Sequence, residues 1–322
     1  MDRIDAMKVF VSAVDEGSLA GAGRRLGRSP AAVSRAIAFL EEHVGTELLH
    51  RTTRSLKLSE AGERYAAACR RVLVDLEEAD IAAAGERAAP RGTLTVTAPV
   101  IAGEDLLRPM LDAFVKQHPA VSVRLLLVDR PVNLIDEGID VALRIAHLDD
   151  SSFVAIRLGE VRRVVAAAPA YLARHPVIHE PADLAKHQII AMTHFGQDSW
   201  TFAPPPGSSV ARAVQFTPRL IVNTVRGAVA SAAEGNGVTR VFSYHIAAEI
   251  KGGQLKILLG QDEYPPLPVH LLAPPGRFSV PKVRAFADFA VPRLKHYFES
   301  LSREAKETGE VIRSRGGRVS AG

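Results

Sequence analysis

The stretch SLAGAGRRLGRSPAAVSRAIAFLEE, residues 18–42, decides the N-terminal fold. Its pattern predicts two short helices joined by a tight turn at Gly27, with the small residue Gly23 before the turn. Ser29 and Pro30 form the start signal of the second helix. The Ser oxygen can accept an orphan backbone N–H, and Pro has no donor that would go unpaired there.

The second helix has two distinct faces. Val33, Ile37 and Leu40 recur at spacings of four and three, which predicts one apolar face that is buried. In a helix-turn-helix the second helix lies in the DNA major groove, with its N-terminal residues toward the base edges. We therefore expect Ser29 and Pro30 to set the helix start, and three residues to face bases: Ala31, Ser34 and Arg35.

The same stretch allows other interpretations. GAGRRLG, residues 21–27, has one of the spacings seen in dinucleotide-binding loops, and residues 7–14 could be a strand before it. That fingerprint requires the first Gly directly after the strand, whereas a polar turn, residues 15–18, intervenes. A dinucleotide-dependent enzyme that uses this loop is the alternative function. A structural helical hairpin without a DNA role is a further alternative.

Basic residues concentrate in the two helices and in the short segment that follows them. Residues 24–57 carry seven Lys or Arg and three Asp or Glu, although the whole chain has a net charge of only +4. A local basic patch of this kind is typical of a site-specific DNA-binding protein. The segment suits a wing that holds the DNA backbone, and the expected contacts are Arg51, Thr53 and Arg54.

A long helix is predicted over residues 59–84. Its apolar positions form a heptad seam, which suits pairing with a second chain, although packing against its own domain remains an alternative. The proposed dimerisation residues are Tyr65, Cys69, Val72, Leu76 and Ala79. Cys69 is the single cysteine, which excludes an intramolecular disulfide and argues against a zinc cluster. We expect it to be a core residue rather than a redox sensor.

These stretches together resemble a known family. Residues 1–88 are similar to the N-terminal domain of LysR-type transcriptional regulators through MDRIDAMKVFVSAVDEGSL, SPAAVSRAIAFLE, LLHRTTRSLKLSEAGERY and the following helix. The resemblance continues to about residue 298. One departure is the second helix, which is usually alanine-rich and is here interrupted by Gly21 and Gly23. Each Gly costs about 1 kcal/mol of helix propensity relative to Ala.

The resemblance implies an α/β fold with an N-terminal all-α winged helix-turn-helix, a long linker helix and a two-lobed periplasmic-binding-protein-like effector domain. The expected domains are residues 1–58 for DNA binding, 59–92 for the linker or dimerisation helix and hinge, and 93–300 for the effector. Lobe I would be 93–162 with 268–300, and lobe II 163–267. The charged, Gly-containing residues 301–322 predict a disordered tail.

From residue 93 onward, strand and helix patterns alternate. This alternation predicts a mostly parallel sheet that is covered on both sides. The expected strands are 94–100, 121–129, 139–145, 161–168, 265–275 and short strands near 189, 220 and 238. The expected helices are 104–117, 133–137, 224–234, 244–251 and 281–301.

A ligand cleft is expected between the lobes, outside the carboxyl ends of the strands. A helix start after Val100 could hold an anion, and polar residues after later strands could bind a ligand or cap a helix. Arg144 could equally be a carboxylate clamp or a surface ion-pair partner. The candidate effector-binding residues, which favour a small anionic or polar organic molecule, are Val100, Ile101, Arg144, Thr193, His194, Asn223 and Thr224.

Several classes of function find no support in the sequence. There is no nucleophile elbow, no Cys–His pair in a protease context and no metal-spaced histidine pair, so we expect no enzyme activity, cofactor or metal. No signal peptide or membrane-spanning apolar run is present, which predicts a cytoplasmic protein. The expected partners are double-stranded promoter or operator DNA and the effector. The resemblance adds a homodimer or homotetramer and RNA polymerase.

Overall fold

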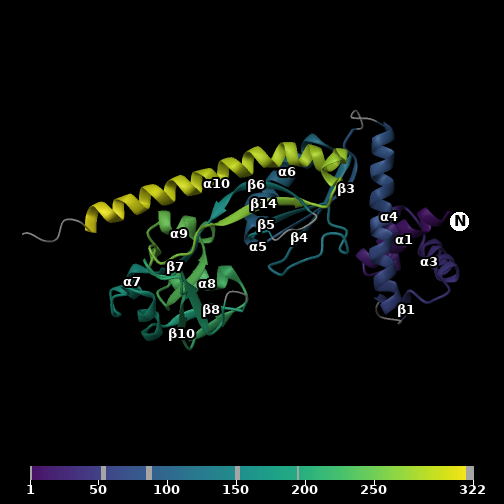
Figure 1. Cartoon of the computed structure of the whole chain (residues 1–322). Coiled ribbons are helices and arrows are strands. Elements are labelled where there is room, and N and C mark those ends of the chain that lie inside the picture. Colours follow the sequence, from purple (N-terminus) through teal and green to yellow (C-terminus); the bar gives the residue numbers. More distant parts are fainter. Residues whose placement is uncertain (1, 52–55, 85–88, 149–152, 194–195, 317–322) are drawn as a thin grey trace, which may run out of the picture.

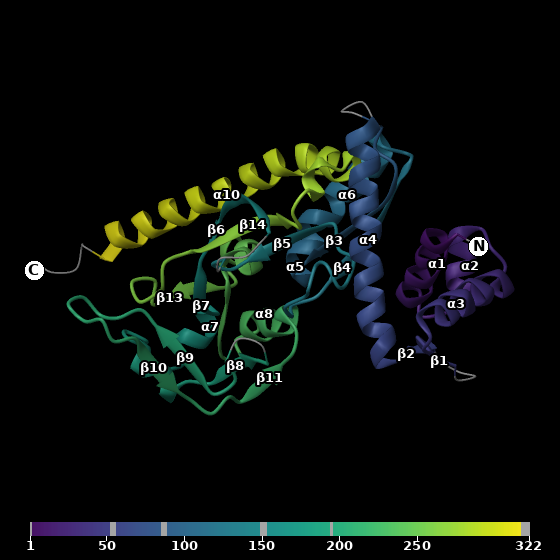
Figure 2. The same cartoon turned by 45° about the vertical axis from the view of Figure 1, so that its right-hand side comes forward.

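A computed structural model of the 322-residue chain describes residues 2–51, 56–84, 89–148, 153–193 and 196–316. A small helical domain lies at the N-terminus, and a long helix, α4 (Glu60–Ala84), stands between it and the larger α/β domain (Figures 1 and 2). The larger domain has two lobes. The chain thus has the three parts that the sequence predicts.

The N-terminal domain is built around one apolar core. Val9 and Phe10 of the first helix meet Val33, Ile37 and Leu40 of the third, and all five side chains are buried. The first, second and third helices are α1 (Arg3–Asp15), α2 (Leu19–Leu26) and α3 (Pro30–Val44), followed by an antiparallel pair, β1 (Leu49–Arg51) and β2 (Leu56–Leu58).

Two glycines that depart from the family pattern allow close packing in α2. A Cβ on Gly23 would lie 2.6 Å from the carbonyl oxygen of Arg28, and one on Gly21 would lie 2.8 Å from Cβ of Glu16. Gly27 ends α2 with a φ of +64°, a left-handed conformation that glycine adopts at little cost. The two glycines therefore lower the helix propensity of α2, but they allow the chain on either side of α2 to pack closely against it.

The seam on α4 is divided between two environments. Ser59 caps the helix by accepting the Gly62 N–H at 2.9 Å. Tyr65 and Cys69 pack into the core of the N-terminal domain, and the Tyr65 ring lies 5.9 Å from that of Phe10. Val72 is 44% exposed. The prediction that one continuous seam pairs with another chain is thus wrong for its first half, because the domain's own core uses those side chains.

Two five-stranded sheets form in the described part of the larger domain. Each has two parallel and two antiparallel junctions, so the predicted mostly parallel sheet is wrong. The chain leaves lobe I on one strand and returns on a neighbouring one, which forces those two to be antiparallel. The strand order in the lobe I sheet is β4 (Val121–Leu127), β3 (Gly92–Ala98), β5 (Val141–Ile145), β14 (Leu267–Ala273), β6 (Val154–Val161). The order in the lobe II sheet is β11 (Leu220–Val222), β8 (Ile189–Met192), β12 (Val238–Phe242), β7 (Arg163–Ala167), β13 (Lys256–Leu258).

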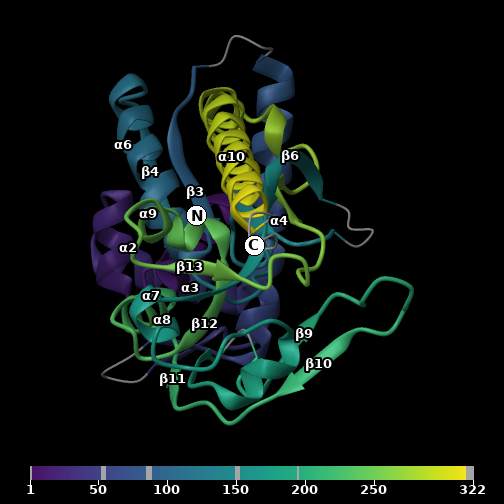
Figure 3. The ribbon, with the colours of Figure 1, turned by 90° about the vertical axis from the view of Figure 1, so that its left-hand side faces the viewer.

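Helices pack on both sheets, and α10 runs the length of the domain from lobe I (Figure 1). A hairpin projects from lobe II, formed by β9 (Ser199–Phe202) and β10 (Arg212–Gln215) (Figure 3). The remaining elements are α5 (Val100–Ala102), η1 (Gly103–Leu107), α6 (Arg108–Gln117), α7 (Pro169–Leu172), η2 (Pro181–Lys186), α8 (Val225–Ala233), η3 (Ser243–Ile246), α9 (Ala247–Lys251), η4 (Arg277–Ser279) and α10 (Pro281–Gly316).

Some predicted elements need correction. Residues 134–138 form a turn rather than a helix, because the Asn133 side chain accepts the N–H groups of Ile135 and Asp136 at 3.1 and 3.3 Å. Helix α10 continues to Gly316, so the predicted disorder from residue 301 is wrong as far as that residue. Ala, Glu and Lys in this stretch are strong helix formers, although their composition offers no core. Strands β6, β9, β10 and β13 were not expected.

Candidate functional site

The exposed face of α3 carries the residues that the sequence assigns to base contacts. Ser29 accepts the Ala32 N–H at 3.2 Å, and Pro30 is the first helical residue, so together they fix where α3 begins. Ala31 and Arg35 are exposed, whereas Ser34 is half-buried. Arg35 makes no hydrogen bond or ion pair with another described residue, which leaves its guanidinium available to a partner.

Other arginines of the basic patch are engaged within the domain. Arg28 forks onto the Asp5 carboxylate at 2.7 and 2.8 Å, and this contact lowers the pKa of Asp5. Arg25 lies 3.4 Å from Glu16 and 3.6 Å from Asp15. The wing contacts predicted for Thr53, Arg54 and the Arg51 side chain fall outside the described part of the chain; the backbone of Arg51 ends β1.

The second site is a cavity of about 370 Å³ between the two lobes. Lobe I contributes the end of β5 and the segment after β4, and lobe II contributes the hinge side of β7 and the turn after β12. The lining residues are Pro99, Val128, Asp129, Arg130, Pro131, Val132, Arg144, Ile145, Ala146, Arg163, Val225, Phe242, Tyr244 and His245. The cavity thus combines an apolar wall with several cationic and hydrogen-bonding groups.

Arg144 is the most informative residue of this cavity. Its Nη1 donates to the carbonyl oxygen of Arg130 at 3.4 Å, while its Nη2 is buried and has no hydrogen-bond partner among the described residues. Burial lowers the pKa of Arg144, and the neighbouring Glu137 carboxylate partly offsets this effect. A buried donor left unpaired is costly, so the site favours a ligand that supplies an acceptor.

Lobe II adds three polar groups. The Arg163 guanidinium lies 5.4 Å from the centre of the Phe242 ring, and burial lowers the pKa of Arg163. The Tyr244 hydroxyl is buried without a partner in the described part of the chain, and its pKa is raised by burial and by nearby Asp129. His245 Nδ1 accepts the Phe242 N–H at 3.2 Å, and burial lowers the pKa of His245 to about 3. Its imidazole is therefore neutral, with the proton on Nε2.

Two family models match the chain. Residues 4–63 match the bacterial regulatory helix-turn-helix protein model of the lysR family, and residues 87–295 match the LysR substrate binding domain. The chain belongs to the LysR family. This LysR regulator is a DNA-binding transcriptional regulator with an effector-binding domain, as its sequence predicts.

Its relatives include both activators and repressors. An HTH-type transcriptional regulator of Xanthomonas campestris pv. campestris is 33% identical over 89% of this chain and 84% of the relative. The activator AaeR of Escherichia coli is 31% identical over 84% and 87%, and an HTH-type transcriptional repressor of Pseudomonas aeruginosa is 30% identical over 90% and 92%. Similarity to these relatives therefore does not determine whether the chain activates or represses transcription.

Solved structures of full-length LysR-type regulators have the same fold. CrgA from Neisseria meningitidis is 28% identical, with a TM-score of 0.57 over 90% of this chain and 98% of CrgA. The virulence activator AphB of Vibrio cholerae is 25% identical, with a TM-score of 0.58 over 91% of this chain and 99% of AphB. The order of helix-turn-helix, linker helix and two lobes is thus a property of the family.

The LysR regulator is not an enzyme, and the dinucleotide-loop alternative is wrong. Residues 21–27 lie in α2 and its turn, and the segment before them is the helix α1 rather than a strand. Within the described ranges, no three His, Cys, Asp or Glu residues lie together as a metal site would require. None of the helices in those ranges combines the length and apolar content needed to cross a bilayer.

Among the predicted effector residues that the structure describes, Arg144 is the one that lines the cavity. The Val100 N–H already donates to Asp129 Oδ1 at 3.0 Å, so the regulator's own carboxylate occupies the expected anion site there, and the next residue, Ile101, is buried. Thr224 caps α8 by accepting the Gly227 N–H at 3.3 Å. Neither Asn223 nor Thr193 lines the cavity, and His194 lies outside the described residues.

Sequence reasoning missed the lobe II side of this cavity. Arg163 is a charged residue within the apolar run VRRVVAAA. Phe242 ends a buried strand, and Tyr244 and His245 continue a nearly unbroken aromatic run after it. Both patterns are unusual enough to attract attention. Their position opposite Arg144 depends on two chain crossings between the lobes and cannot be read from local spacing.

Proposed function

We propose that this LysR regulator binds a small anionic organic effector in its interlobe cavity and thereby changes how the helix-turn-helix engages promoter DNA. The observation that carries the proposal is the buried Nη2 of Arg144, which faces no acceptor in the described chain. A carboxylate or similar anion would satisfy it. Arg163 would add a second positive charge, while Tyr244 and His245 Nε2 would add neutral donors.

The proposed DNA interface centres on α3. Arg35 is exposed and can form a bidentate contact with a guanine edge, with Ala31 and Ser34 beside it. Ser29 and Pro30 would position the helix. Arg51, Thr53 and Arg54 of the wing would hold phosphates, which positions the protein without reading sequence. Promoter binding would place the regulator in the cytoplasm, with RNA polymerase as a candidate partner.

The effector would act through closure of the two lobes. An anion held by groups from both lobes binds the closed arrangement better and so shifts the population toward it. A charged link already joins the two lobes, because Arg226 of α8 lies 2.9 Å from Glu104 and 2.8 Å from Asp105. A cavity of about 370 Å³ suits a small organic acid.

We propose that the second half of α4 forms the dimer seam. Val72 and Ala79 are exposed and Leu76 is half-buried, whereas Tyr65 and Cys69 support the seam from inside the N-terminal domain. A charge placed at Leu76 would be buried without a partner in a dimer. Sedimentation should show Leu76→Asp with fewer dimers or tetramers than wild type. A monomeric wild type would exclude the seam.

A thermal-shift screen of small organic acids and aromatics on the full-length chain tests the effector site. Compounds that bind raise the melting temperature by mass action. Calorimetry then compares wild type with Arg144→Ala, and with Arg157→Ala as a control at an exposed arginine of β6. Loss of affinity in Arg144→Ala alone supports the cavity. Equal affinity in all three proteins would place the ligand elsewhere.

DNA binding is tested by footprinting and gel shift on DNA that flanks the chain's own gene. A protected site supports the proposed regulator. Binding to the flanking DNA that is no tighter than binding to a random duplex would argue against a specific site there.

A further inference from the structure

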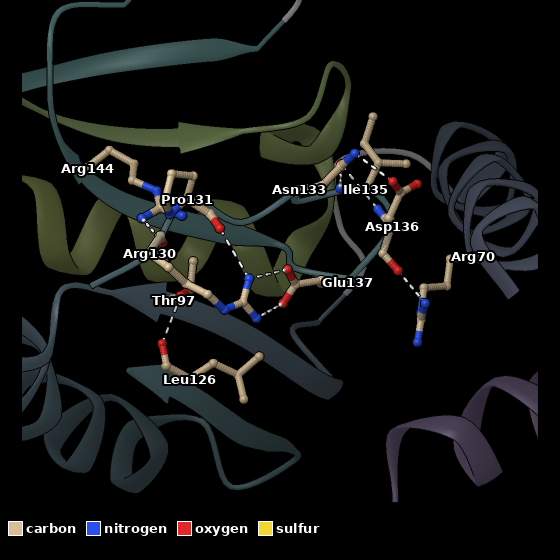
Figure 4. A network of polar contacts seen from close by, with 10 residues as sticks. All are labelled: Arg70, Thr97, Leu126, Arg130, Pro131, Asn133, Ile135, Asp136, Glu137 and Arg144. Atoms are coloured by element: carbon tan, nitrogen blue, oxygen red, sulfur yellow. Dashed lines mark hydrogen bonds and ion pairs between the residues drawn. The ribbon is translucent and has the colours of Figure 1, made fainter. Parts of the chain in front are cut away.

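The segment after β4, residues 130–140, joins the effector cavity to the linker helix (Figure 4). Arg130, Pro131 and Val132 line the cavity. Four residues later the carbonyl oxygen of Asp136 accepts a hydrogen bond from Nη1 of Arg70, which lies on α4. A single short segment therefore lines the proposed ligand site and also contacts α4, the helix that leads to the DNA-binding domain.

An ion pair connects the cavity end of this segment, at Arg130, to Glu137 on the other side of the turn. Arg144 donates to the Arg130 carbonyl at 3.4 Å. The Arg130 guanidinium in turn reaches Glu137 at 3.2 and 3.5 Å, so it spans the turn (Figure 4). A ligand that draws on Arg130 or Arg144 must therefore alter contacts that also hold residue 137.

The turn between these ends is stiff. Asn133 accepts two backbone N–H groups and donates to the Asp136 carboxylate at 2.6 Å. The segment ends at Asp140, which is buried, accepts the Thr95 N–H at 2.8 Å and pairs with Arg277. Hydrogen bonds therefore hold the turn at Asn133 and fix the end of the segment at Asp140. Because of them, a displacement at the cavity side should move the turn as a rigid unit.

On α4, the Arg70 side chain joins the turn to the DNA-binding domain. Arg70 is only 13% exposed, and its Nη2 donates to Asp15 Oδ1 at 2.8 Å. Asp15 is the last residue of α1 and also meets Arg124 of β4, whose Nη2 donates to the Asp15 carbonyl at 3.1 Å. A Cβ on Gly138, which has a φ of +63°, would lie 3.2 Å from Cδ of Arg70. Glycine at 138 therefore gives the Arg70 stem its room.

We infer that the turn at 133–138 and Arg70 relay the state of the effector cavity to α1 within the same chain. This inference rests on the proposed function and adds the route of regulation. The forked guanidinium is essential to the relay because it donates to lobe I and to α1 at once, in two fixed directions. A lysine amine at this position would keep the charge but could not reproduce that fork.

A double-mutant cycle on the full-length chain tests the relay without any effector. Arg130→Ala perturbs the cavity side and Arg70→Lys removes the fork. Arg64→Lys is the matched control, at an exposed arginine of α4 that pairs with Glu60 on the same helix. We measure affinity for DNA upstream of the chain's own gene, and hydrogen exchange of residues 10–17 at the end of α1. We expect Arg130→Ala to change the affinity about three-fold or more and to alter this exchange.

Both effects should disappear in the Arg70→Lys background and persist in the Arg64→Lys background. Gly138→Ala, which crowds Arg70 from the lobe side, should weaken them in the same way and serves if Arg70→Lys folds poorly. Equal effects of Arg130→Ala with and without the Arg70 fork would overturn the relay. If no variant or wild type binds DNA, the proposed function fails, while the exchange of residues 10–17 still decides the relay.

Discussion

Arg35 and Arg144 carry the same guanidinium in opposite environments. Arg35 stands exposed on α3, without a partner among the described residues, whereas Arg144 lines the interlobe cavity with one nitrogen buried and unpaired. The exposed group keeps its hydration until DNA arrives. The buried group lost its hydration on folding and recovers the cost when a ligand binds. Environment, rather than residue type, therefore separates a polyanion contact from a small-molecule clamp.

Salt should separate the two sites most widely. Phosphate contacts release counterions, so DNA affinity should fall by about 10³-fold between 50 and 200 mM salt for some six contacts. Effector affinity should change several-fold at most, because a buried pair is poorly screened. Anisotropy on DNA and calorimetry on the effector over the same salt series measure this. Parallel slopes would remove the distinction between Arg35 and Arg144.

Removing Arg144 should abolish most effector binding. Arg144→Ala loses hydrogen bonds to a charged group, and we expect a loss of about 1.5–3 kcal/mol in binding free energy. The free protein should lose little stability, because the substitution removes one long hydrogen bond, 3.4 Å to the Arg130 carbonyl, together with a buried nitrogen that has no partner among the described residues. Calorimetry and thermal unfolding measure both quantities. A large drop in stability would mean that Arg144 is a structural residue.

Removing Arg35 should affect one DNA sequence more than others. Arg35→Ala should cost about 1–3 kcal/mol on the specific site and relax the preference for its base pair. Arg54→Ala should instead weaken all DNA similarly and reduce the salt slope, as expected for a phosphate contact. Gel shifts on specific and random duplexes compare them. Equal losses on both duplexes for Arg35→Ala would argue against a base contact.

The cavity should also make stability depend on pH. The pKa of His245 is about 3 in the folded chain against an ordinary 6.5, so below pH 6.5 the unfolded state binds the extra proton. Stability should therefore fall by about 1 kcal/mol between pH 7 and 5.5 through this residue. Denaturant unfolding of wild type and His245→Gln measures the difference. The same pH slope in both proteins would contradict a buried neutral imidazole.

The smallest effect is expected at Arg28, which is basic and exposed like Arg35 but already forks onto Asp5. Arg28→Ala should change DNA affinity by less than about two-fold, because its guanidinium is committed within the domain. Anisotropy with Arg35→Ala as the positive control measures this. A loss of DNA affinity as large as that of Arg35→Ala would show that an exposed arginine contacts DNA even when its guanidinium already has a partner within the domain.

The N-terminal domain was largely predictable because its signals are local. Ser29 caps α3 three residues away, Gly27 ends α2, and Val33 and Ile37 lie one turn apart on the buried face. Each feature depends on neighbours within about four residues, which sequence spacing reports directly. The same holds for the cap of α8 at Thr224, whose capping alternative is confirmed by its bond to Gly227.

The tertiary structure decided the rest. Arg144, Arg163 and Tyr244 meet only because the chain crosses between the lobes twice, and the same crossings make half of the sheet junctions antiparallel. Packing also assigned Tyr65 and Cys69 to the core, although their heptad spacing equally suits a partner chain. Sequence by itself determined the local elements of the N-terminal domain, the order of the main parts of the chain and the family. Which side chains face one another across the cavity and along α4 depended on long-range packing, because residues far apart in the chain carry no local spacing that relates them.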